Sequence, residues 1–407
     1  MADLNQCNGS SLKDSEDKVQ KKFSGKNLLI ISDMFPDEGD NIISSKFVKD
    51  QVNAIKDLFE NIYVISVLSY YYKLTDVGKY CHDYSYENVH VYYPYRFFIP
   101  LRFTKKFLID FRYKAVLNVI REHNLKFDII HGHMTQPSGL ICLILKEKYG
   151  VPYVLTIHEN EFWLADEIKL NHSSIVDSWK NADALIRVNK NDIPLLLRWN
   201  PNSYYVPNVF SSKYYSRDRD QCRNKLGLPM DAEILFSLGN LIERKGFSYL
   251  IESVVQMHKD GHEIFCYIGG SGPEREHLQM LIDKYNMTTH IHLIGKISEE
   301  DSCLWMNAAN LFVLPSLNES FGVVNIEAMA CGTPVVGTNV GGVPSIIIDN
   351  RYGLLVEPAS VDDLKNGILL ALTMSWNKML IHKYAVDNYG DKSLSKKLSD
   401  IYLSLLS

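Results

Sequence analysis

Two carboxylates eight residues apart, Glu319 and Glu327, lie in the segment LPSLNESFGVVNIEAMACGTPVVG at residues 314–337. An apolar strand at 310–315 precedes a polar loop. The apolar spacing of 322–330, followed by Gly332 and Pro334, predicts a short helix. Unpaired N–H groups at the start of such a helix suit an anion such as a diphosphate. Glu319 in the loop and Glu327 in the helix are then able to accept hydrogen bonds from different hydroxyls of one ligand.

Taken alone, such a pair is better explained by a structural role, with Glu319 capping a helix and Glu327 on its solvent-facing side. Within the longer pattern ESFGVVNIEAMACGTPVVGTNVGGVP, however, the sequence resembles the retaining glycosyltransferases of family 4, which belong to the GT-B superfamily and to the glycosyl transferases group 1. The resemblance runs from about residue 27 to the end of the chain. It implies that Glu319 holds the transferred sugar and that Glu327 holds the ribose of the nucleotide. It also places the loop and first helical turn beside the donor: Ser320, Phe321, Gly322, Val323 and Val324.

The segment SLGNLIERKGF at 237–247 carries Gly239 and Asn240 after a strand, and Arg244 and Lys245 just before a helix. Adjacent cations at a helix start oppose the helix dipole unless an anion is present. A surface Arg-Lys pair is the alternative. The resemblance implies that both cations bind the donor diphosphate, so that no metal and no separate cofactor are required.

Two more turns of the second half resemble donor-binding segments of the family. GGSGP at 269–273, with Gly270 and Gly272, ends a strand and begins a helix, although glycine turns also serve close packing alone. GKISEED at 295–301 implies backbone contact with the nucleobase near Ile297. A third glycine turn, VGGVPSII at 340–348, is interpreted as structural.

In the first half, His158 ends a strand in TIHENEF (156–162), and His133 ends another in HGH (131–133). A histidine at a strand end is usually structural, but relatives carry a histidine beside the sugar and phosphate at the position of His158. His133 is the weaker candidate, and we find no companion ligands that would turn His-x-His into a metal site. The loop after the first strand, where relatives have two glycines that approach acceptor and phosphate, offers only Gly39.

Other residues that suggest metal or redox chemistry have simpler interpretations. The one Asp-x-Asp motif, Asp218-Arg219-Asp220, resembles a metal-holding pair but lies in a charged stretch with no preceding strand, and we interpret it as solvated charge. The seven cysteines are scattered without a C-x-x-C motif, which favours reduced, buried thiols.

Composition and charge limit the class of protein. A chain of 407 residues with 46% hydrophobic and 22% charged residues predicts two soluble domains of ordinary size. No apolar run approaches a membrane span, and the first residues lack a signal-peptide core, so we expect a cytoplasmic protein. The net charge of −5 argues against a nucleic-acid binder.

Apolar runs alternate with helical patterns through both halves, which predicts an α/β protein with parallel sheets covered on both faces. We expect a disordered extension at 1–23, an N-terminal acceptor-binding Rossmann-like domain at 24–207 and a C-terminal nucleotide-sugar-binding Rossmann-like domain at 208–375. The resemblance implies the GT-B fold, in which the two doubly wound domains face a central cleft. It also implies a helical tail at about 376–407 that crosses back to complete the first domain.

The segment 96–126 combines aromatic residues with eight basic and two acidic side chains, a local charge of +6. One interpretation is a helix that packs its aromatic face on the core while the charged side chains extend outward. The other is peripheral contact with an anionic membrane surface, since basic residues and interfacial aromatics both favour it. Relatives with lipid-linked acceptors dock through their first domain in this way.

These observations together predict a retaining glycosyltransferase that moves a hexose-type sugar from a UDP- or GDP-sugar to a hydroxyl of a glycan or lipid-linked acceptor. No carboxylate nucleophile stands out in the first half, which favours a same-face reaction assisted by the leaving phosphate. The alternatives are a sugar-nucleotide epimerase or phosphorylase of the same fold, and a non-catalytic partner subunit. The last predicts loss of the charged site residues, yet Glu319, Glu327, Arg244 and Lys245 are all present.

Overall fold

The computed structural model describes residues 21–33, 35–41, 45–69, 75–96, 105–170 and 173–406. These residues form two compact units. The first contains the chain up to Val188, the segment Asp192–Val206 and the residues from Leu394 onward, and the second contains Asn189–Asn191 and Pro207–Ser393. The segment that returns to the first unit thus begins at Leu394, later than the expected position near residue 376. Phe23, assigned from the sequence to the disordered extension, is fully buried and packs edge-on against Phe59.

The first unit is built on an eight-stranded sheet in the order β10-β9-β8-β7-β1-β2-β5-β4. All neighbouring strands are parallel except β4 and β5, which are antiparallel. Two short strands, β3 (Leu68–Ser69) and β6 (Tyr95–Arg96), pair in parallel as a separate two-stranded sheet. The strands of the large sheet are β1 (Asn27–Ile31), β2 (Asn61–Ile65), β4 (Tyr84–Tyr86), β5 (Val89–Tyr92), β7 (Ile129–His133), β8 (Tyr153–Ile157), β9 (Ala184–Arg187) and β10 (Ser203–Tyr205).

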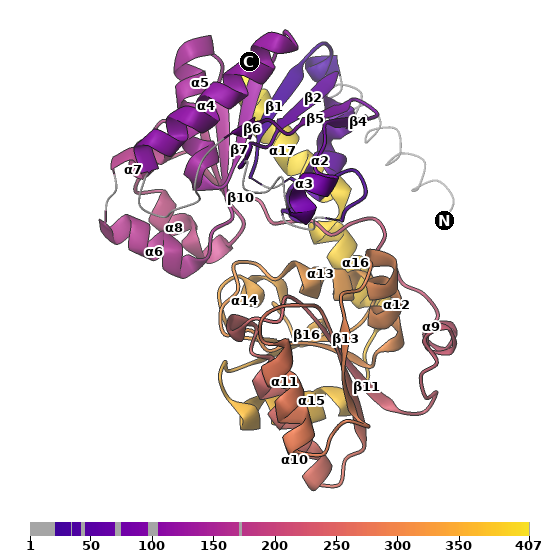
Figure 1. Ribbon diagram of the computed structural model, residues 1–407. Coiled ribbons are helices and arrows are strands. Elements are labelled where there is room, and N and C mark those ends of the chain that lie inside the picture. The colour runs from indigo at the N-terminus through magenta and orange to yellow at the C-terminus, as the bar shows by residue number, and fades with distance from the viewer. Residues whose placement is uncertain are drawn as a thin grey trace, which may run out of the picture. The chain divides into compact units, whose positions relative to one another are not determined.

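Helices cover both faces of this sheet, because alternate side chains of each strand point to opposite faces. On one face, residues such as Ile130 and Leu155 form a core with α4 (Lys105–Glu122), α5 (Leu140–Tyr149) and α7 (Ser173–Lys180). On the other face, β7 presents His131, whose ring contacts Tyr402 of α17 (Asp391–Leu406). Figure 1 shows α17, in yellow, beside the strands of the first unit. This helix confirms the expected crossing of the C-terminal tail into the first unit.

The second unit has a six-stranded, fully parallel sheet in the order β13-β12-β11-β14-β15-β16. Each of its six strands is one of the apolar runs that alternate with helical patterns in the second half of the sequence. They are β11 (Glu233–Leu238), β12 (Ile264–Gly269), β13 (Ile291–Gly295), β14 (Leu311–Leu314), β15 (Val335–Thr338) and β16 (Gly353–Val356).

One face of the second sheet is covered by a core that unites α10 (Phe247–Lys259), α11 (Arg275–Lys284) and α15 (Val361–Thr373), which lie together in Figure 1. Towards the other face, Phe236 and Phe312 lie against one another, and Phe236 stacks on Trp305 of α12 (Glu299–Ala308). The remaining helices that matter for the site are α9 (Arg219–Leu226), α13 (Val323–Ala330), α14 (Val343–Ile346) and α16 (Lys378–Tyr389). Among the described residues, no helix is both long and apolar enough to cross a membrane.

Candidate active site

The order of the second sheet creates a position where two strand-end loops diverge. β11 and β14 are neighbours, but the chain leaves β11 towards β12 on one side and β14 towards β15 on the other. In doubly wound sheets, ligands bind at the carboxyl ends of the strands at such a point. The loop after β11 carries Arg244 and Lys245, and the loop after β14 carries Glu319. The topology therefore brings together three of the residues predicted from the sequence.

The two loops are joined by an ion pair between the Lys245 ammonium and the Glu319 carboxylate. Each of these side chains is only 11% exposed, so the pair is largely shielded from solvent. Arg244 donates from Nη1 to the carbonyl oxygen of Asn318 at 3.3 Å and accepts at its own carbonyl from the N–H of Leu317 at 2.8 Å. Glu319 thus supplies the counter-charge for Lys245 in this structure, a pairing that the sequence did not indicate.

Glu327 lies in α13, which begins after Gly322 in the left-handed conformation with φ of 90°. The loop therefore turns sharply into the helix, and Val323 and Val324 form its first turn as predicted. Glu327 is buried, with 8% of its surface exposed. Phe321 is also buried, and its ring packs edge-on against Tyr389 of α16. This contact anchors the loop between β14 and α13 to α16.

Glycines allow the surrounding loops to pack backbone against backbone. Gly270 has φ of 134°, and a Cβ there would overlap the carbonyl oxygen of Gly239, while its N–H donates to Gly295 O at 2.7 Å. Gly341, in the turn interpreted as structural, likewise approaches Glu319 so closely that a Cβ would overlap the Glu319 carbonyl oxygen. That turn therefore supports a predicted site residue.

The other predicted donor residues occupy the same group of loops. The N–H of Leu241 donates to Ser271 O at 2.9 Å, so the 239–241 turn is held against the 270–272 turn. Asn240 is exposed on this turn. Ile297 packs close to Gly269, since its Cδ1 lies 3.3 Å from the point where a Cβ on Gly269 would be. The structure thus places Gly239, Asn240, Gly270, Gly272 and Ile297 at the ends of three adjacent strands.

In the first unit, His131 and His133 of β7 and His158, the residue after β8, stack in a row. The His131 and His133 ring centroids are 4.4 Å apart, and those of His133 and His158 are 5.3 Å apart. His133 Nδ1 and His158 Nε2 are 3.0 Å apart and share a hydrogen bond. His131 is bonded at both nitrogens, to Tyr402 Oη and to Thr156 Oγ1, each at 2.7 Å. The row forms because adjacent parallel strands end side by side, with β7 paired to β8.

Burial keeps these imidazoles neutral. It lowers the pKa of His131 to about 3. It also lowers the pKa of His133 well below the ordinary value, with smaller contributions from His131 and His158. The pKa of His158 is likewise held well below its ordinary value, first by burial and then by the charge of Arg187. At neutral pH the row therefore consists of hydrogen-bonding groups without charge.

Two residues that the sequence did not single out hold His158 in place. Glu159 accepts hydrogen bonds from the N–H of Thr135 at 2.6 Å and from the N–H of His158 at 3.1 Å, so its carboxylate ties the end of β8 to the loop after β7. Burial raises the pKa of Glu159, and these N–H groups and Arg187 oppose the rise. Arg187, fully buried and paired with Asp192, donates to the carbonyls of Ile157 and Glu159 on either side of His158. An arginine within the apolar run ALIRV was the signal in the sequence.

Gly39 is not joined to the histidine row by the contacts of its turn. Its N–H donates to the Asp37 carboxylate at 3.1 Å, and that carboxylate also accepts from Asn41. Among the described residues of this region, Phe47 in α2 (Lys46–Ile55) contacts the row, with its ring centroid 4.5 Å from that of His158. Met34 and residues 42–44, in the same loop, lie outside the described residues.

The Asp-x-Asp motif has a structural role. Asp218 caps α9, because its carboxylate accepts from the N–H of Gln221 at 2.9 Å, and Asp220 pairs with Arg219. No three His, Cys, Asp or Glu side chains among the described residues are placed to hold a metal ion. Six of the cysteines are buried and free, and Cys7 lies outside the described residues.

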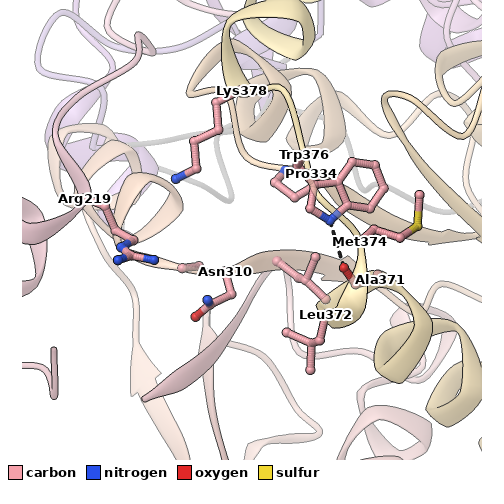
Figure 2. A pocket seen from close by; sticks show the side chains of 10 residues that line it. Arg219, Asn310, Pro334, Ala371, Leu372, Met374, Trp376 and Lys378 are labelled. Atoms are coloured by element: carbon pink, nitrogen blue, oxygen red, sulfur yellow. Dashed lines mark hydrogen bonds between the residues drawn. The ribbon is translucent and has the colours of Figure 1, made fainter. Parts of the chain in front are cut away.

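A cavity of about 190 Å³ lies at the opposite edge of the second sheet, at the amino ends of β14 and β15. Figure 2 shows Arg219 and Lys378 beside Asn310 at one side, and Leu372, Met374 and Trp376 at the other. The indole of Trp376 donates to the carbonyl of Ala371 at 2.8 Å. None of the predicted site residues lines this cavity.

Comparison with known proteins identifies the family. A model described as Glycosyl transferases group 1 matches residues 218–388, and one described as Glycosyltransferase Family 4 matches residues 75–191. An uncharacterized glycosyltransferase of Methanocaldococcus jannaschii is 30% identical over 291 residues, which cover 70% of this chain and 75% of that protein. The chain belongs to glycosyltransferase family 4. It is therefore a transferase enzyme, as the sequence predicted.

Solved structures show that this family 4 glycosyltransferase has the GT-B fold. A sucrose-phosphate synthase from Thermosynechococcus elongatus has a TM-score of 0.75 at 21% identity, covering 93% of this chain and 99% of its own. HepE of Anabaena, in complex with UDP, has a TM-score of 0.71 at 18% identity, covering 93% of this chain and all of its own. At these identities the likeness concerns the fold.

Proposed function

We propose that this family 4 glycosyltransferase transfers a hexose-type sugar, with retention of configuration, from a UDP- or GDP-sugar to a hydroxyl of a glycan or lipid-linked acceptor. The observation that carries the proposal is the group formed by Arg244, the Lys245–Glu319 pair and the start of α13 at the diverging loops of the second sheet. Two cations and the N–H groups of a helix start suit a diphosphate. Two buried carboxylates suit the hydroxyls of a sugar and a ribose.

In this proposal the leaving group is the nucleoside diphosphate. Arg244, Lys245 and the first turn of α13 stabilise the negative charge that develops on it, which is electrostatic catalysis by preorganised groups. These cations supply the positive charge, so we propose no metal cofactor. Glu319 accepts from hydroxyls of the transferred sugar once Lys245 turns to the diphosphate, and Glu327 accepts from the ribose.

Retention does not require a covalent intermediate in this proposal. Glu159 is the carboxylate next to His158, but both of its oxygens accept from backbone N–H groups, which favours a role in positioning over attack on the sugar. We therefore propose that the leaving phosphate assists deprotonation of the acceptor hydroxyl on the same face of the sugar. His158, neutral because of its burial, is proposed to hydrogen-bond the sugar or its phosphate.

The test is a thermal-shift screen with UDP-glucose, UDP-galactose, UDP-GlcNAc and GDP-mannose, followed by a nucleotide-release assay with the best binder. UDP-glucose is a sensible first probe, because HepE has been solved in complex with it. We expect one sugar nucleotide to raise the melting temperature and to be slowly hydrolysed by the wild type and not by Glu319→Ala. A protein that binds none of these donors contradicts the proposal. Products that form from the donor alone without hydrolysis, or only with added phosphate, favour an epimerase or a phosphorylase instead.

We also propose peripheral contact with anionic membranes through the basic segment 96–126. Four of its eight basic residues have side chains that the structure describes: Arg112, Lys114, Arg121 and Lys126. Arg112 forms an ion pair with Asp33 at 2.9 Å. Lys114, Arg121 and Lys126 are exposed. Flotation with anionic liposomes at low salt should therefore weaken when these three exposed residues are replaced by Glu. Unchanged flotation, or none in the wild type, contradicts this contact.

A further inference from the structure

The three histidines of the row differ in how many of their ring nitrogens have hydrogen-bond partners. His131 has a hydrogen-bond partner at both ring nitrogens. His133 and His158 are bonded to one another, and within the described part of the chain neither His133 Nε2 nor His158 Nδ1 has a hydrogen-bond partner. His133 is 1% exposed and His158 is 7% exposed, so these two outer nitrogens are also shielded from water. Buried polar atoms without partners are rare and call for an explanation.

The shared hydrogen bond couples the two rings. A neutral imidazole has one N–H and one unprotonated nitrogen. If His133 Nδ1 donates to His158 Nε2, then His158 must carry its proton on Nδ1, and His133 Nε2 is an acceptor. If His158 Nε2 donates instead, then His133 must carry its proton on Nε2, and His158 Nδ1 is an acceptor. In both cases the two rings have the same tautomer, and the outer nitrogens provide one donor and one acceptor.

We propose that His133 and His158 form a single hydrogen-bonding unit that binds a hydroxyl-bearing ligand, with one outer nitrogen donating to it and the other accepting from it. A phosphate dianion accepts hydrogen bonds but does not donate them, and so it satisfies only the donor end. A sugar hydroxyl both donates and accepts and therefore satisfies either end in either tautomer. The ligand class is a carbohydrate or polyol, and this identification rests on the proposed function. His133 thereby becomes a ligand-binding residue in its own right.

The surroundings support a binding role for this pair. His158 is fixed from behind by Glu159 and Arg187, which engage its backbone and its neighbours and leave the ring nitrogens free of competing bonds. His131 and Phe47 cover the outer faces of the two rings, and therefore restrict ring rotation. Such preorganisation lowers the entropic cost of binding.

The first test is ¹⁵N NMR of the histidine-labelled full chain, with signals assigned through His131→Phe, His133→Phe and His158→Phe. We expect His133 and His158 to show the same neutral tautomer, either both Nδ1–H or both Nε2–H. Opposite tautomers, or a charged ring at neutral pH, would overturn the proposal. The tautomers are read from the wild-type protein, the variants serve only to assign its signals, and the measurement does not depend on enzymatic activity.

The second test asks which ligand the pair contacts. UDP-glucose is compared with UDP, and GDP-mannose with GDP, by calorimetry and by the histidine signals. Signals of both rings that move with a sugar nucleotide and not with its nucleoside diphosphate identify the donor sugar. Signals that move only when D-glucose is added to the UDP-bound protein identify the acceptor. If neither addition moves them, the unit does not bind hydroxyls and the proposal fails.

Phenylalanine variants complete the design, because Phe keeps the stacked ring and removes the hydrogen bonds. If the donor sugar is the ligand, His133→Phe weakens the sugar nucleotide about tenfold and leaves the nucleoside diphosphate unchanged, as expected for one lost hydrogen bond. If the acceptor is the ligand, the same loss appears for D-glucose. His131→Phe is the matched control, and an equal effect of that variant would indicate a merely structural role. Absence of binding by any nucleotide contradicts the proposed function and leaves the tautomer result to be judged separately.

Discussion

Replacing Glu319 by Gln removes the carboxylate that faces the Lys245 ammonium and leaves that ammonium largely shielded from solvent. Breaking a fully buried ion pair from one side costs about 3–5 kcal/mol. Because each side chain keeps 11% of its surface exposed, water can reach the remaining charge, and we expect the lower end, about 3 kcal/mol. Lys245→Met, which keeps the aliphatic stem, should cost a similar amount by leaving the carboxylate unpaired.

The double variant Lys245→Met/Glu319→Gln has no unpaired charge. It should therefore be no less stable than either single variant, which corresponds to a coupling energy of roughly 3 kcal/mol between the two positions.

Because the chain has two compact units, a single unfolding transition is not a safe measure of this effect. Amide hydrogen exchange of peptides from β11 and β14 reports the free energy of opening the second unit. A peptide from β7 in the first unit is the internal reference and should be unaffected. Single-variant losses that simply add in the double variant would refute the reasoning, because they would mean that the two charges do not interact.

Three further predictions concern other parts of the molecule. Because the pKa values of His131, His133 and His158 are lowered in the folded protein, the unfolded chain binds more protons than the folded chain below pH 6.5, and stability falls as the pH decreases from there. Three such groups lower the free energy of unfolding by about 4 kcal/mol per pH unit at most, which is measured by hydrogen exchange of β7 and β8 peptides at pH 7.5 and 5.5 after correction for intrinsic rates. A wild-type pH dependence equal to that of His131→Phe would contradict this account. Gly270→Ala forces a Cβ onto the carbonyl oxygen of Gly239 at φ of 134° and should abolish nucleotide binding in calorimetry, whereas Gly261→Ala, also at positive φ but with no atom within 4 Å of its Cβ, should cost only about 1 kcal/mol and retain binding. Glu159→Gln replaces one of two accepting oxygens by an N–H donor, so it should destabilise the ends of β7 and β8 by about 1–3 kcal/mol. It should also lower the rate of sugar transfer and leave the affinity for the nucleoside diphosphate unchanged. A loss of that affinity instead would place Glu159 at the nucleotide.

Much of the second unit could be predicted from the sequence, because its strands are continuous apolar runs separated by helical patterns, and buried parallel strands produce that pattern directly. The helix at 323–330 and the positions of Arg244, Lys245 and Glu319 in loops that follow strands come from local signals. Less of the first unit could be predicted from the sequence. Its last two strands, β9 and β10, are short, and the fully buried Phe23 follows a polar stretch that gave no sign of packing.

The sequence by itself determined the family, the alternation of strands and helices, and the residue types available for chemistry, since these depend on local pattern and on the composition of motifs. Only the tertiary structure decided which of those residues meet. The Lys245–Glu319 pair spans 74 residues, and the bond between His131 and Tyr402 spans 271 residues. No local signal encodes such contacts, because they depend on strand order and on where the last helix packs. For the same reason the roles of Glu159 and Arg187, and the shared proton of His133 and His158, became visible only when the ends of β7, β8 and β9 were seen side by side.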